Sequence, residues 1–427
     1  MSRIGFVAIA IALAAGSAVA TMAAAGAESP LARAHGSDTT ARALAVRDLV
    51  FFRAHKDDGD ELWRTDGTKA GTNQVKDINP GPDSSYPGGF VRLGGSVVFS
   101  ADDGSNGTEL WKTDGTPAGT KRVSQIAPGA DGASINNLTR FGDIVLFSAD
   151  DGEVGSELWR SDGTKRGTKL VKDINPDSQD SSPSWMAQLG RRVFFSAVDP
   201  VHGIELWRTD GTRRGTKLFK NIAPGVLSSS PLHLARLGRL LLFSATGAGD
   251  PNWELWKTDG TRGGTKLVKE INPGNAASFP TGFERLGDAL LFAAATEDDG
   301  TELWRTRGTA RSTRMVKDIH PGMSGSNPYE LARLGRDVVF QANEPEHGFE
   351  LWRSDGTKRG TRLLKDINPT GNSSPCGMTR LRRQLIFGAY ESDDGYELWH
   401  TDGTRAGTRL LKDIVDGPDG SLPFACT

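Results

Sequence analysis

A tripeptide that recurs at a nearly fixed spacing is the feature that most constrains how this chain of 427 residues can fold. The tripeptide is Glu-Leu-Trp, and successive copies begin 47 to 49 residues apart. The eight copies begin at Glu61, Glu109, Glu157, Glu205, Glu254, Glu302, Glu350 and Glu397. This regularity indicates one supersecondary unit copied in tandem, and a unit of that size cannot bury a core without its neighbours.

The second copy shows how one unit is built. Four short runs, at 90–93, 97–101, 109–113 and 121–126, are rich in apolar, β-branched or aromatic residues, and each stops at a turn containing Gly. Such runs without helical periodicity predict a four-stranded antiparallel meander. Apolar residues on both faces of the middle runs suit a sheet that is covered on both sides. We therefore predict an all-β chain that forms a single eight-bladed β-propeller over residues 43–427.

The sixth copy departs from the others in the turn after its third run. Asp follows Trp by three residues in the other seven copies, whereas this copy has Arg307, and Ser312 replaces a Gly. Because Asp-Gly suits tight hairpins, we expect the sixth copy to have the least regular turn. The loop before Glu-Leu-Trp varies most in copies four, five and seven.

The N-terminal segment has the pattern of a targeting sequence. Arg3 precedes an apolar run at 4–15, and small residues at 18–20 and 25–27 offer cleavage sites. This pattern predicts a signal peptide over 1–27, which we expect to be followed by a polar linker over 28–42. The alternative is a retained membrane anchor, although the run is short for a spanning helix. We expect a secreted or cell-surface protein, or a periplasmic one, without membrane insertion after cleavage.

The charge balance bears on the kind of partner. The chain has 51 Lys and Arg against 53 Asp and Glu, a formal net charge of −2. Proteins that bind nucleic acid usually show a basic excess, so we expect no nucleic-acid partner. We expect a monomer whose partner is a protein or a glycan.

The two ends of the repeat array are expected to meet. Residues 421–427 match the start of a further copy, as at 373–376, so we expect this tail to lie against the first blade. Edge pairing of this sort removes an exposed strand edge. Cys376 would then open the eighth blade and Cys426 would lie in or beside the first, which favours a disulfide in an oxidising compartment. Two buried thiols are the alternative.

The repeated sequence also resembles a known family. Glu-Leu-Trp-x-x-Asp-Gly-Thr in tandem resembles the ELWxxDGT-repeat proteins, which are exported bacterial proteins without an assigned activity. The resemblance covers about 385 residues, from Ala43 to Thr427. It implies secretion and a repeat architecture, and it implies no reaction.

A second resemblance is local. The spacing of Ala101, Asp103, Gly107 and Trp111 recurs in copies three, four, seven and eight, with Glu in place of Asp in the last two. It is similar to the tryptophan-docking motif of the eight-bladed quinoprotein dehydrogenases, in which the motif locks neighbouring blades together. The resemblance implies eight blades. It does not imply quinoprotein chemistry, because the vicinal cysteine pair of the alcohol-oxidising members is missing.

The tryptophans and glutamates of the repeat are first of all structural candidates. A ligand needs one site and not eight, so we assign the tryptophans to packing between blades. They are Trp63, Trp111, Trp159, Trp207, Trp256, Trp304, Trp352 and Trp399. The glutamates are too uniform for catalysis, which needs unlike environments for acid and base. We expect each to bond the following Lys or Arg, or backbone N–H groups in the preceding Gly turn; the alternative is a ring of carboxylates that lines the channel and binds cations.

Paired aspartates in Gly-containing loops are the candidate metal ligands. Calcium takes several oxygen ligands, which such pairs can supply. The candidates are Asp102, Asp103, Asp150, Asp151, Asp298 and Asp299, with similar pairs at 57–58 and 393–394. Turn formation explains Asp and Gly equally well. We predict no cofactor, with calcium as the metal that these loops could take.

These observations predict an exported propeller that acts as a binding or adhesion module for a protein or glycan, with variation confined to loops on a rigid scaffold. We assign no catalytic and no cofactor-binding residue. The alternative is a secreted enzyme, either a quinoprotein-like oxidoreductase or a glycan hydrolase or lyase, that uses residues from blades that break the repeat.

Overall fold

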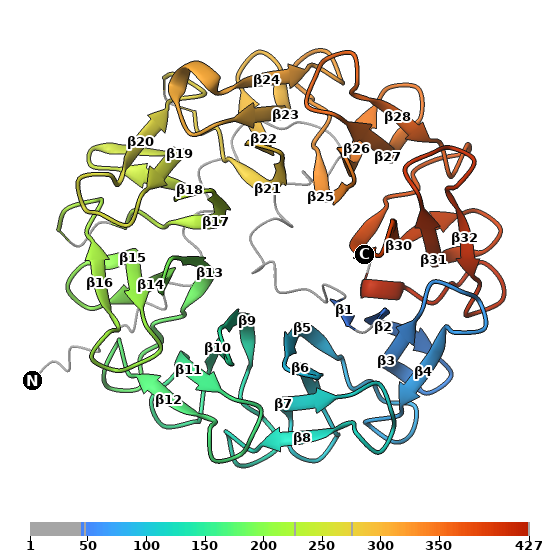
Figure 1. Ribbon diagram of the computed structural model, residues 1–427, viewed down its shortest axis with the longest axis horizontal. Helices are drawn as coiled ribbons and strands as arrows, with labels where there is room; N and C mark the ends of the chain where they lie inside the picture. Colours follow the sequence, from blue (N-terminus) through green and yellow to red (C-terminus); the bar gives the residue numbers. More distant parts are fainter. Residues whose placement is uncertain (1–43, 47, 226–227, 275, 426–427) are drawn as a thin grey trace, which may run out of the picture. The chain divides into compact units, whose positions relative to one another are not determined.

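The computed structural model describes residues 44–46, 48–225, 228–274 and 276–425. These residues form eight four-stranded antiparallel sheets arranged as blades around a channel, which confirms the all-β, eight-bladed propeller (Figure 1). In every blade the strands follow chain order from the channel to the rim. No helix in this part of the chain is long and apolar enough to span a membrane. The predicted signal peptide and linker lie outside the described residues.

Each blade contributes one strand to each of four positions. The first strands are β1 (Leu44–Val46), β5 (Gly88–Leu93), β9 (Asn136–Phe141), β13 (Ser184–Leu189), β17 (Leu232–Leu237), β21 (Thr281–Leu286), β25 (Tyr329–Leu334) and β29 (Cys376–Leu381). The second strands are β2 (Leu49–Lys56), β6 (Ser96–Asp102), β10 (Ile144–Ala149), β14 (Arg192–Asp199), β18 (Leu240–Gly247), β22 (Ala289–Thr296), β26 (Asp337–Glu344) and β30 (Gln384–Glu391).

The outer two positions hold the repeated motif and the rim. The third strands are β3 (Gly59–Thr65), β7 (Thr108–Thr113), β11 (Glu157–Ser161), β15 (Gly203–Thr209), β19 (Asp250–Thr258), β23 (Gly300–Thr306), β27 (Gly348–Ser354) and β31 (Gly395–Thr401). The fourth strands are β4 (Asn73–Lys76), β8 (Lys121–Ser124), β12 (Lys169–Lys172), β16 (Lys217–Lys220), β20 (Lys266–Lys269), β24 (Arg314–Lys317), β28 (Arg362–Lys365) and β32 (Arg409–Lys412).

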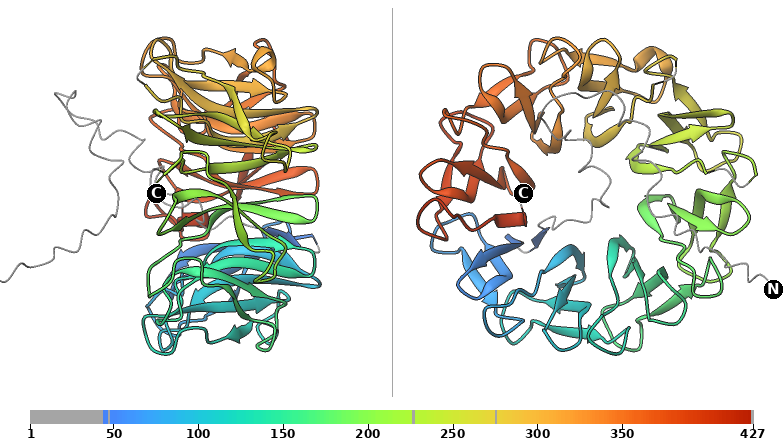
Figure 2. Two further views of the ribbon diagram at one scale, coloured as in Figure 1. Left: turned by 90° about the vertical axis from the view of Figure 1, so that its left-hand side faces the viewer. Right: turned by 180° about the vertical axis from the view of Figure 1, so that it is seen from behind.

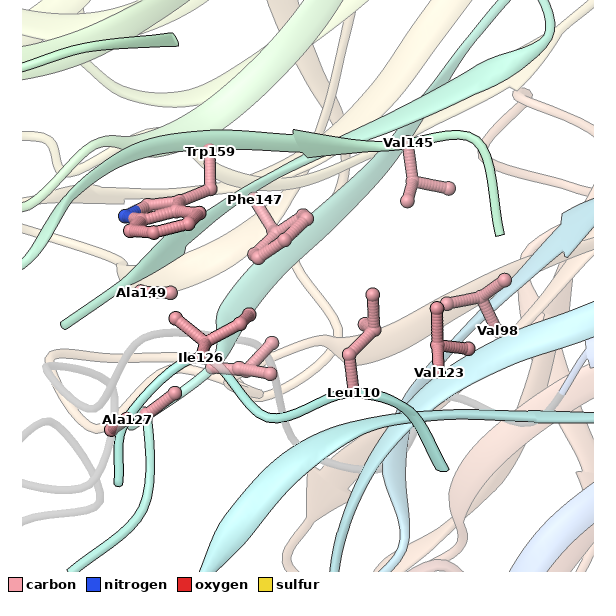
Figure 3. Close-up of a cluster of buried hydrophobic side chains, with 11 residues drawn as sticks. Val98, Leu110, Val123, Ile126, Ala127, Val145, Phe147, Ala149 and Trp159 are labelled. Carbon is pink, nitrogen blue, oxygen red and sulfur yellow. The ribbon is translucent and has the colours of Figure 1, made fainter. Parts of the chain in front are cut away.

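The second strand of each blade is buried on both sides. In β2, Val50 and Phe52 pack against the eighth blade, whereas Phe51 between them packs against the second blade. Strand alternation thus sends successive side chains into two different cores. One apolar cluster forms at each boundary between neighbouring blades. Figure 3 shows the cluster between blades two and three, where Leu110 lies near Phe147 of the next blade.

Basic side chains also cross most of these boundaries. The Lys or Arg that follows Glu-Leu-Trp donates to a turn carbonyl of the next blade, as Arg160 Nη1 does to Gly211 O at 3.1 Å. The same bond joins Arg64 to Gly115, Lys112 to Gly163, Lys257 to Gly308, Arg305 to Gly356 and Arg353 to Gly403. At the two other boundaries this position is held by Arg208 and His400, which make different contacts.

The C-terminal tail closes the ring, as predicted. The carbonyl of Ser421 accepts from His55 N of the first blade at 2.7 Å. The Phe424 ring, in a short 3-10 turn (η3, Pro423–Ala425), lies 5.2 Å from the Phe52 ring and joins the core between blades eight and one. Cys376 is disulfide-bonded, and its predicted partner Cys426 lies outside the described residues.

The turns between third and fourth strands depend on a close approach between Asp and Gly. In blade three, Asp162 Oδ1 accepts from Thr164 N and Thr164 Oγ1 at 2.9 and 2.6 Å. A Cβ atom at Gly167 would lie 2.0 Å from that same oxygen. The sixth blade has a short 3-10 turn here instead (η2, Ala310–Ser312), which fits the expected irregularity. There the Ser312 hydroxyl accepts from Thr309 N and Thr309 Oγ1, at 3.3 and 2.8 Å, and so takes over the role of the aspartate.

This geometry predicts that the Asp and Gly positions are coupled. Gly167→Ser should lower the free energy of unfolding by about 1–3 kcal/mol, because the new side chain overlaps the Asp162 carboxylate. Asp162→Arg combined with Gly167→Ser reproduces the sixth blade and should recover most of that loss, which a double-mutant cycle in urea would measure. Additive losses would contradict the coupling.

The closure contact predicts a second effect on stability. Phe424→Ala should lower the free energy of unfolding by about 3–5 kcal/mol, because it removes a buried phenyl group from the core between the first and last blades. Leu422→Ala is the matched control, since Leu422 is 36% exposed in the same tail. Urea unfolding followed by tryptophan fluorescence would measure both, and equal effects would count against the closure role.

Candidate functional site

The glutamates of the repeat do not face the channel. All eight are at most 1% exposed. In blade three, Glu157 Oε2 accepts from Ile174 N at 2.8 Å and from Ser181 Oγ at 2.7 Å, and Oε1 accepts from Asn175 N and Ser181 N at 3.1 and 3.2 Å. Our expectation of backbone donors is met, but these donors follow the fourth strand and are not in the preceding Gly turn. In six blades the following Lys or Arg reaches the next blade instead.

This carboxylate fixes the link to the next blade. Ser181 N and Ser182 N both donate to the carbonyl of Ser156, and the Ser181 carbonyl accepts from Val198 N of the next blade at 3.0 Å. A single glutamate therefore joins the end of one blade to the second strand of another. We call this arrangement the glutamate staple. It consists of the glutamate, the serine that donates to it, and the two backbone N–H groups after the fourth strand, which in blade three are those of Ile174 and Asn175.

The staple recurs around the ring with one variation. A serine fills the role of Ser181 in seven blades, including Ser421 at the closure. The second blade has Ala133 instead, and both oxygens of Glu109 accept from Ile126 N, at 2.9 and 2.8 Å. The repeated glutamates are thus structural groups.

The repeated tryptophans lie between blades. Seven are buried, and Trp256 is half-buried. Trp111 packs against Leu62 and Val75 of the preceding blade. A lysine of the preceding blade covers most of these rings, as Lys365 Nζ does 5.1 Å above Trp399. This arrangement leaves no room to stack a ligand on the buried rings.

The paired aspartates cap their own turns. Asp102 Oδ1 accepts from Gly104 N at 2.8 Å, and Asp150 Oδ1 accepts from Gly152 N at 2.8 Å. The neighbouring carboxylates of Asp103 and Asp151 likewise accept from backbone N–H groups two and three residues on. Asp299 bonds Thr296 Oγ1 at 3.1 Å, and Asp298 beside it is exposed. Turn formation thus accounts for these hydrogen bonds, and calcium binding stays a prediction.

A different group brings potential metal ligands together. Among the described residues, Glu344, Glu346 and His347 place three ligand atoms within 4.8 Å of one another. His347 Nδ1 bonds Glu344, which raises the pKa of the imidazole. His202 of blade four bonds Asp199 in the same way, at 3.0 Å. None of the six predicted aspartates belongs to such a group of three.

Strand order sorts the loops onto two faces of the ring. In each antiparallel blade, the turns from first to second and from third to fourth strand lie at one end, which we call the basic face. The loops from second to third strand and the links to the next blade lie at the other end, the acidic face. Figure 2 shows the ring from the side, with turns projecting at both ends.

The acidic face has a one-sided charge. The sequence places no lysine or arginine in the segments that join strands there. The loops between second and third strands carry Asp57, Asp58, Asp103, Asp150, Asp151, Glu153, Glu297, Asp298, Asp299, Glu346, Asp393 and Asp394. Further aspartates lie in the links between blades, such as Asp177 and Asp416.

The basic face has a surplus of cations, although its turns between third and fourth strands also carry one aspartate in every blade except the sixth. Its turns between third and fourth strands carry exposed cations in every blade but the second, and these are Lys69, Lys165, Arg166, Arg213, Arg214, Arg262, Arg307, Arg311, Lys358, Arg359 and Arg405. Nearer the channel, a second row on the first strands consists of Arg92, Arg140, Arg236, Arg285, Arg333 and Arg380, with Gln188 in blade four. Each of these arginines donates its Nε to a nearby carbonyl, as Arg285 does to Gly287 O at 3.1 Å, which fixes the side chain.

Comparisons with known proteins support the fold and go no further. No protein-family model and no curated protein matches this chain. A puromycin-hydrolysing peptidase of Mycobacterium tuberculosis is 16% identical with a TM-score of 0.51, over 82% of this chain and 57% of that one. A puromycin hydrolase is 15% identical with a TM-score of 0.50, over 87% and 61%. This chain therefore spans less than two thirds of the length of either hydrolase.

Sequence reasoning missed the division of charge between the faces. A near-zero net charge conceals it, because the two surpluses cancel. The signal was present in the repeat, in the two residues before the last Gly of each turn after Glu-Leu-Trp. It emerges only when each charge is assigned to one end of a strand.

The buried glutamates predict a pH dependence of stability. Burial raises the pKa of Glu61, Glu157 and Glu397 to about 7 from a usual 4.5, although their N–H and hydroxyl donors lower it. The folded state thus binds more protons than the unfolded state between these values, so the free energy of unfolding should be greatest near pH 4.5 and fall towards pH 7. Urea midpoints measured across this range would test the slope.

A matched variant separates the pH dependence caused by a buried glutamate from the titration of other groups. Glu157→Gln cannot titrate, so the slope should become shallower. The variant should also lose about 1–3 kcal/mol, because its amide N–H₂ faces buried donors that then lack an acceptor. If the urea midpoint of the parent protein rises as the pH increases from 4.5 to 7, the raised pKa values of the buried glutamates are contradicted.

Proposed function

We propose that this protein is an exported binding module that holds an anionic glycan against the basic face of its ring. The observation that carries the proposal is the gathering of exposed lysines and arginines on one face, opposite a face whose connecting segments contain none. Structural needs account for the buried glutamates, the tryptophans and the turn aspartates. They do not account for exposed lysines and arginines gathered at one end of the blades.

The form of the basic face suits an extended polyanion. A single exposed ion pair contributes only about 0–1 kcal/mol, so useful affinity requires many contacts at once. Two rows of cations around a ring can meet several anionic groups of one chain, and simultaneous contacts raise the overall affinity. The fixed arginines near the channel lose little conformational entropy on binding.

The net charge makes the attraction local. With a formal charge of −2, the whole molecule does not attract a polyanion from a distance. Only a ligand that approaches within roughly a Debye length, about 8 Å at physiological salt, meets mainly the basic face. The acidic face should repel the same ligand, which would fix the side on which it binds.

The alternative of a secreted enzyme has weaker support. Acid–base catalysis uses groups that exchange protons near neutral pH. Two cavities on the basic face, described below, are lined mainly by arginine, lysine and uncharged residues, with Asp210 as the single carboxylate and without a histidine. Such a lining suits the binding of an anion better than proton transfer.

Chromatography on an immobilised sulfated polysaccharide would test the proposal. The mature chain should be retained at low salt and elute as salt is raised, whereas a neutral polysaccharide should not retain it. Replacing Lys165, Arg166, Lys358 and Arg359 by Gln should weaken binding about tenfold or more, as expected for four lost ion pairs.

The control removes the same number of charges from the other face. Replacing Asp57, Asp298, Asp393 and Asp394 by Asn should leave retention unchanged or strengthen it. If the parent chain passes through the column unretained, or if both variants lose affinity alike, the basic face is not the binding surface.

A further inference from the structure

The boundary between blades four and five departs from the pattern that six other boundaries share. Arg208 occupies the position from which six counterparts donate to a carbonyl of the next blade. Its guanidinium group lies instead over the Phe219 ring, with Cζ 5.3 Å from the centroid. Phe219 stands where the other fourth strands have Val or Leu. Trp256, on the other side of this boundary, is the half-buried member of the tryptophan set.

Two adjoining cavities open beside Arg208 on the basic face. The larger has a volume of about 320 Å³, and its lining includes Arg208, Lys217 and Arg262. The second, of about 240 Å³, shares Arg208 and Lys217 and adds Arg192 and Arg214. Five cationic side chains from two blades therefore border one continuous region.

These five cations outnumber the anions beside them. Asp210 is the single carboxylate among the residues that line the two cavities. Its Oδ1 already accepts from Thr212 N and Thr212 Oγ1, at 3.0 and 2.6 Å. Desolvation and the neighbouring Arg192 and Arg262 lower the pKa of Arg208. Like charges crowded in this way disfavour one another unless a bound anion compensates them.

We propose that these cavities bind a sugar residue that carries a sulfate or phosphate ester. The cations come from strands β14, β15 and β16 and from turns of two blades, so they approach from several directions. A tetrahedral oxyanion can accept from several directions at once, and arginine forks match it well. The combined space exceeds that of the ion and reaches the size of ordinary small-molecule sites, which leaves room for the sugar ring.

The proposal rests on the proposed function for its ligand class, yet it concerns one boundary and not the whole face. Titration calorimetry with glucose 6-sulfate and glucose 6-phosphate would test it, with glucose, inorganic sulfate and inorganic phosphate as comparison ligands. At least one ester should bind, unmodified glucose should not, and the inorganic ions should bind more weakly than the ester.

Paired variants at equivalent positions make the test specific. Arg214→Gln with Lys217→Gln should weaken ester binding at least tenfold, the equivalent of about 1.4 kcal/mol. Arg359→Gln with Arg362→Gln removes two positive charges from the equivalent positions of blade seven. This variant should change the affinity for the ester less than twofold. Phe219→Val removes no charge, and it should still weaken binding severalfold by letting Arg208 return to the neighbouring carbonyl.

The outcomes separate this proposal from the proposed function. No ester binding by the parent chain, or equal losses in the blade-four and blade-seven variants, would overturn the site even if the polysaccharide column retains the protein. Inorganic ions that bind as tightly as the esters would overturn the role of the sugar. Ester binding that is lost only in the blade-four and Phe219 variants would support the site even if the column retains nothing.

Discussion

The buried carboxylate of each Glu-Leu-Trp triplet is the interaction on which the ring depends. It lies on the third strand, yet its partners follow the fourth strand and open the link to the next blade. Loss of the carboxylate would leave up to four buried donors unpaired, at about 1–3 kcal/mol each. That cost rivals the gain from burying a whole apolar side chain, about 1.5–3 kcal/mol. The residue just before the glutamate contributes its backbone carbonyl, so its side chain varies, from Asp60 to Ile204 to Trp253.

The staple also holds a strained backbone. The residue after the stapled serine, or after Ala133 in blade two, has a left-handed conformation, as in Ser182 (φ 44°) and Phe279 (φ 41°). For residues other than glycine this conformation costs about 1–2 kcal/mol, so it persists only where surrounding bonds fix it. Ser421 and Leu422 (φ 44°) repeat the arrangement at the C-terminus. The ring therefore closes with the same bonds that join its interior blades.

The sequence was sufficient to predict the blades, because Gly-containing turns mark strand ends at a constant period. For the glutamates the sequence left open a bond to the following Lys or Arg, a bond to backbone N–H groups, or a place along the channel. The true donors to Glu157, from Ile174 to Ser181, come 17 to 24 residues later, and only the fold brings them back. The order of charges along the chain does not reveal the two faces for a related reason, because strand direction decides at which end of a blade each charge lies. The sequence shows Phe219 where other blades have Val or Leu. It does not show that the Arg208 guanidinium group, on the neighbouring strand, lies over the Phe219 ring.

A closed ring of similar boundaries allows one boundary to change. Seven boundaries keep their tryptophan buried, and every blade keeps its glutamate buried. Giving up the bond between Arg208 and a turn carbonyl forfeits about 0.5–1.5 kcal/mol, which is small beside the apolar core of the same boundary. The scaffold therefore tolerates a local excess of cations at blades four and five without opening. In a repeat protein, a position where one copy abandons a contact that the others keep is a better guide to function than the residues that all copies share.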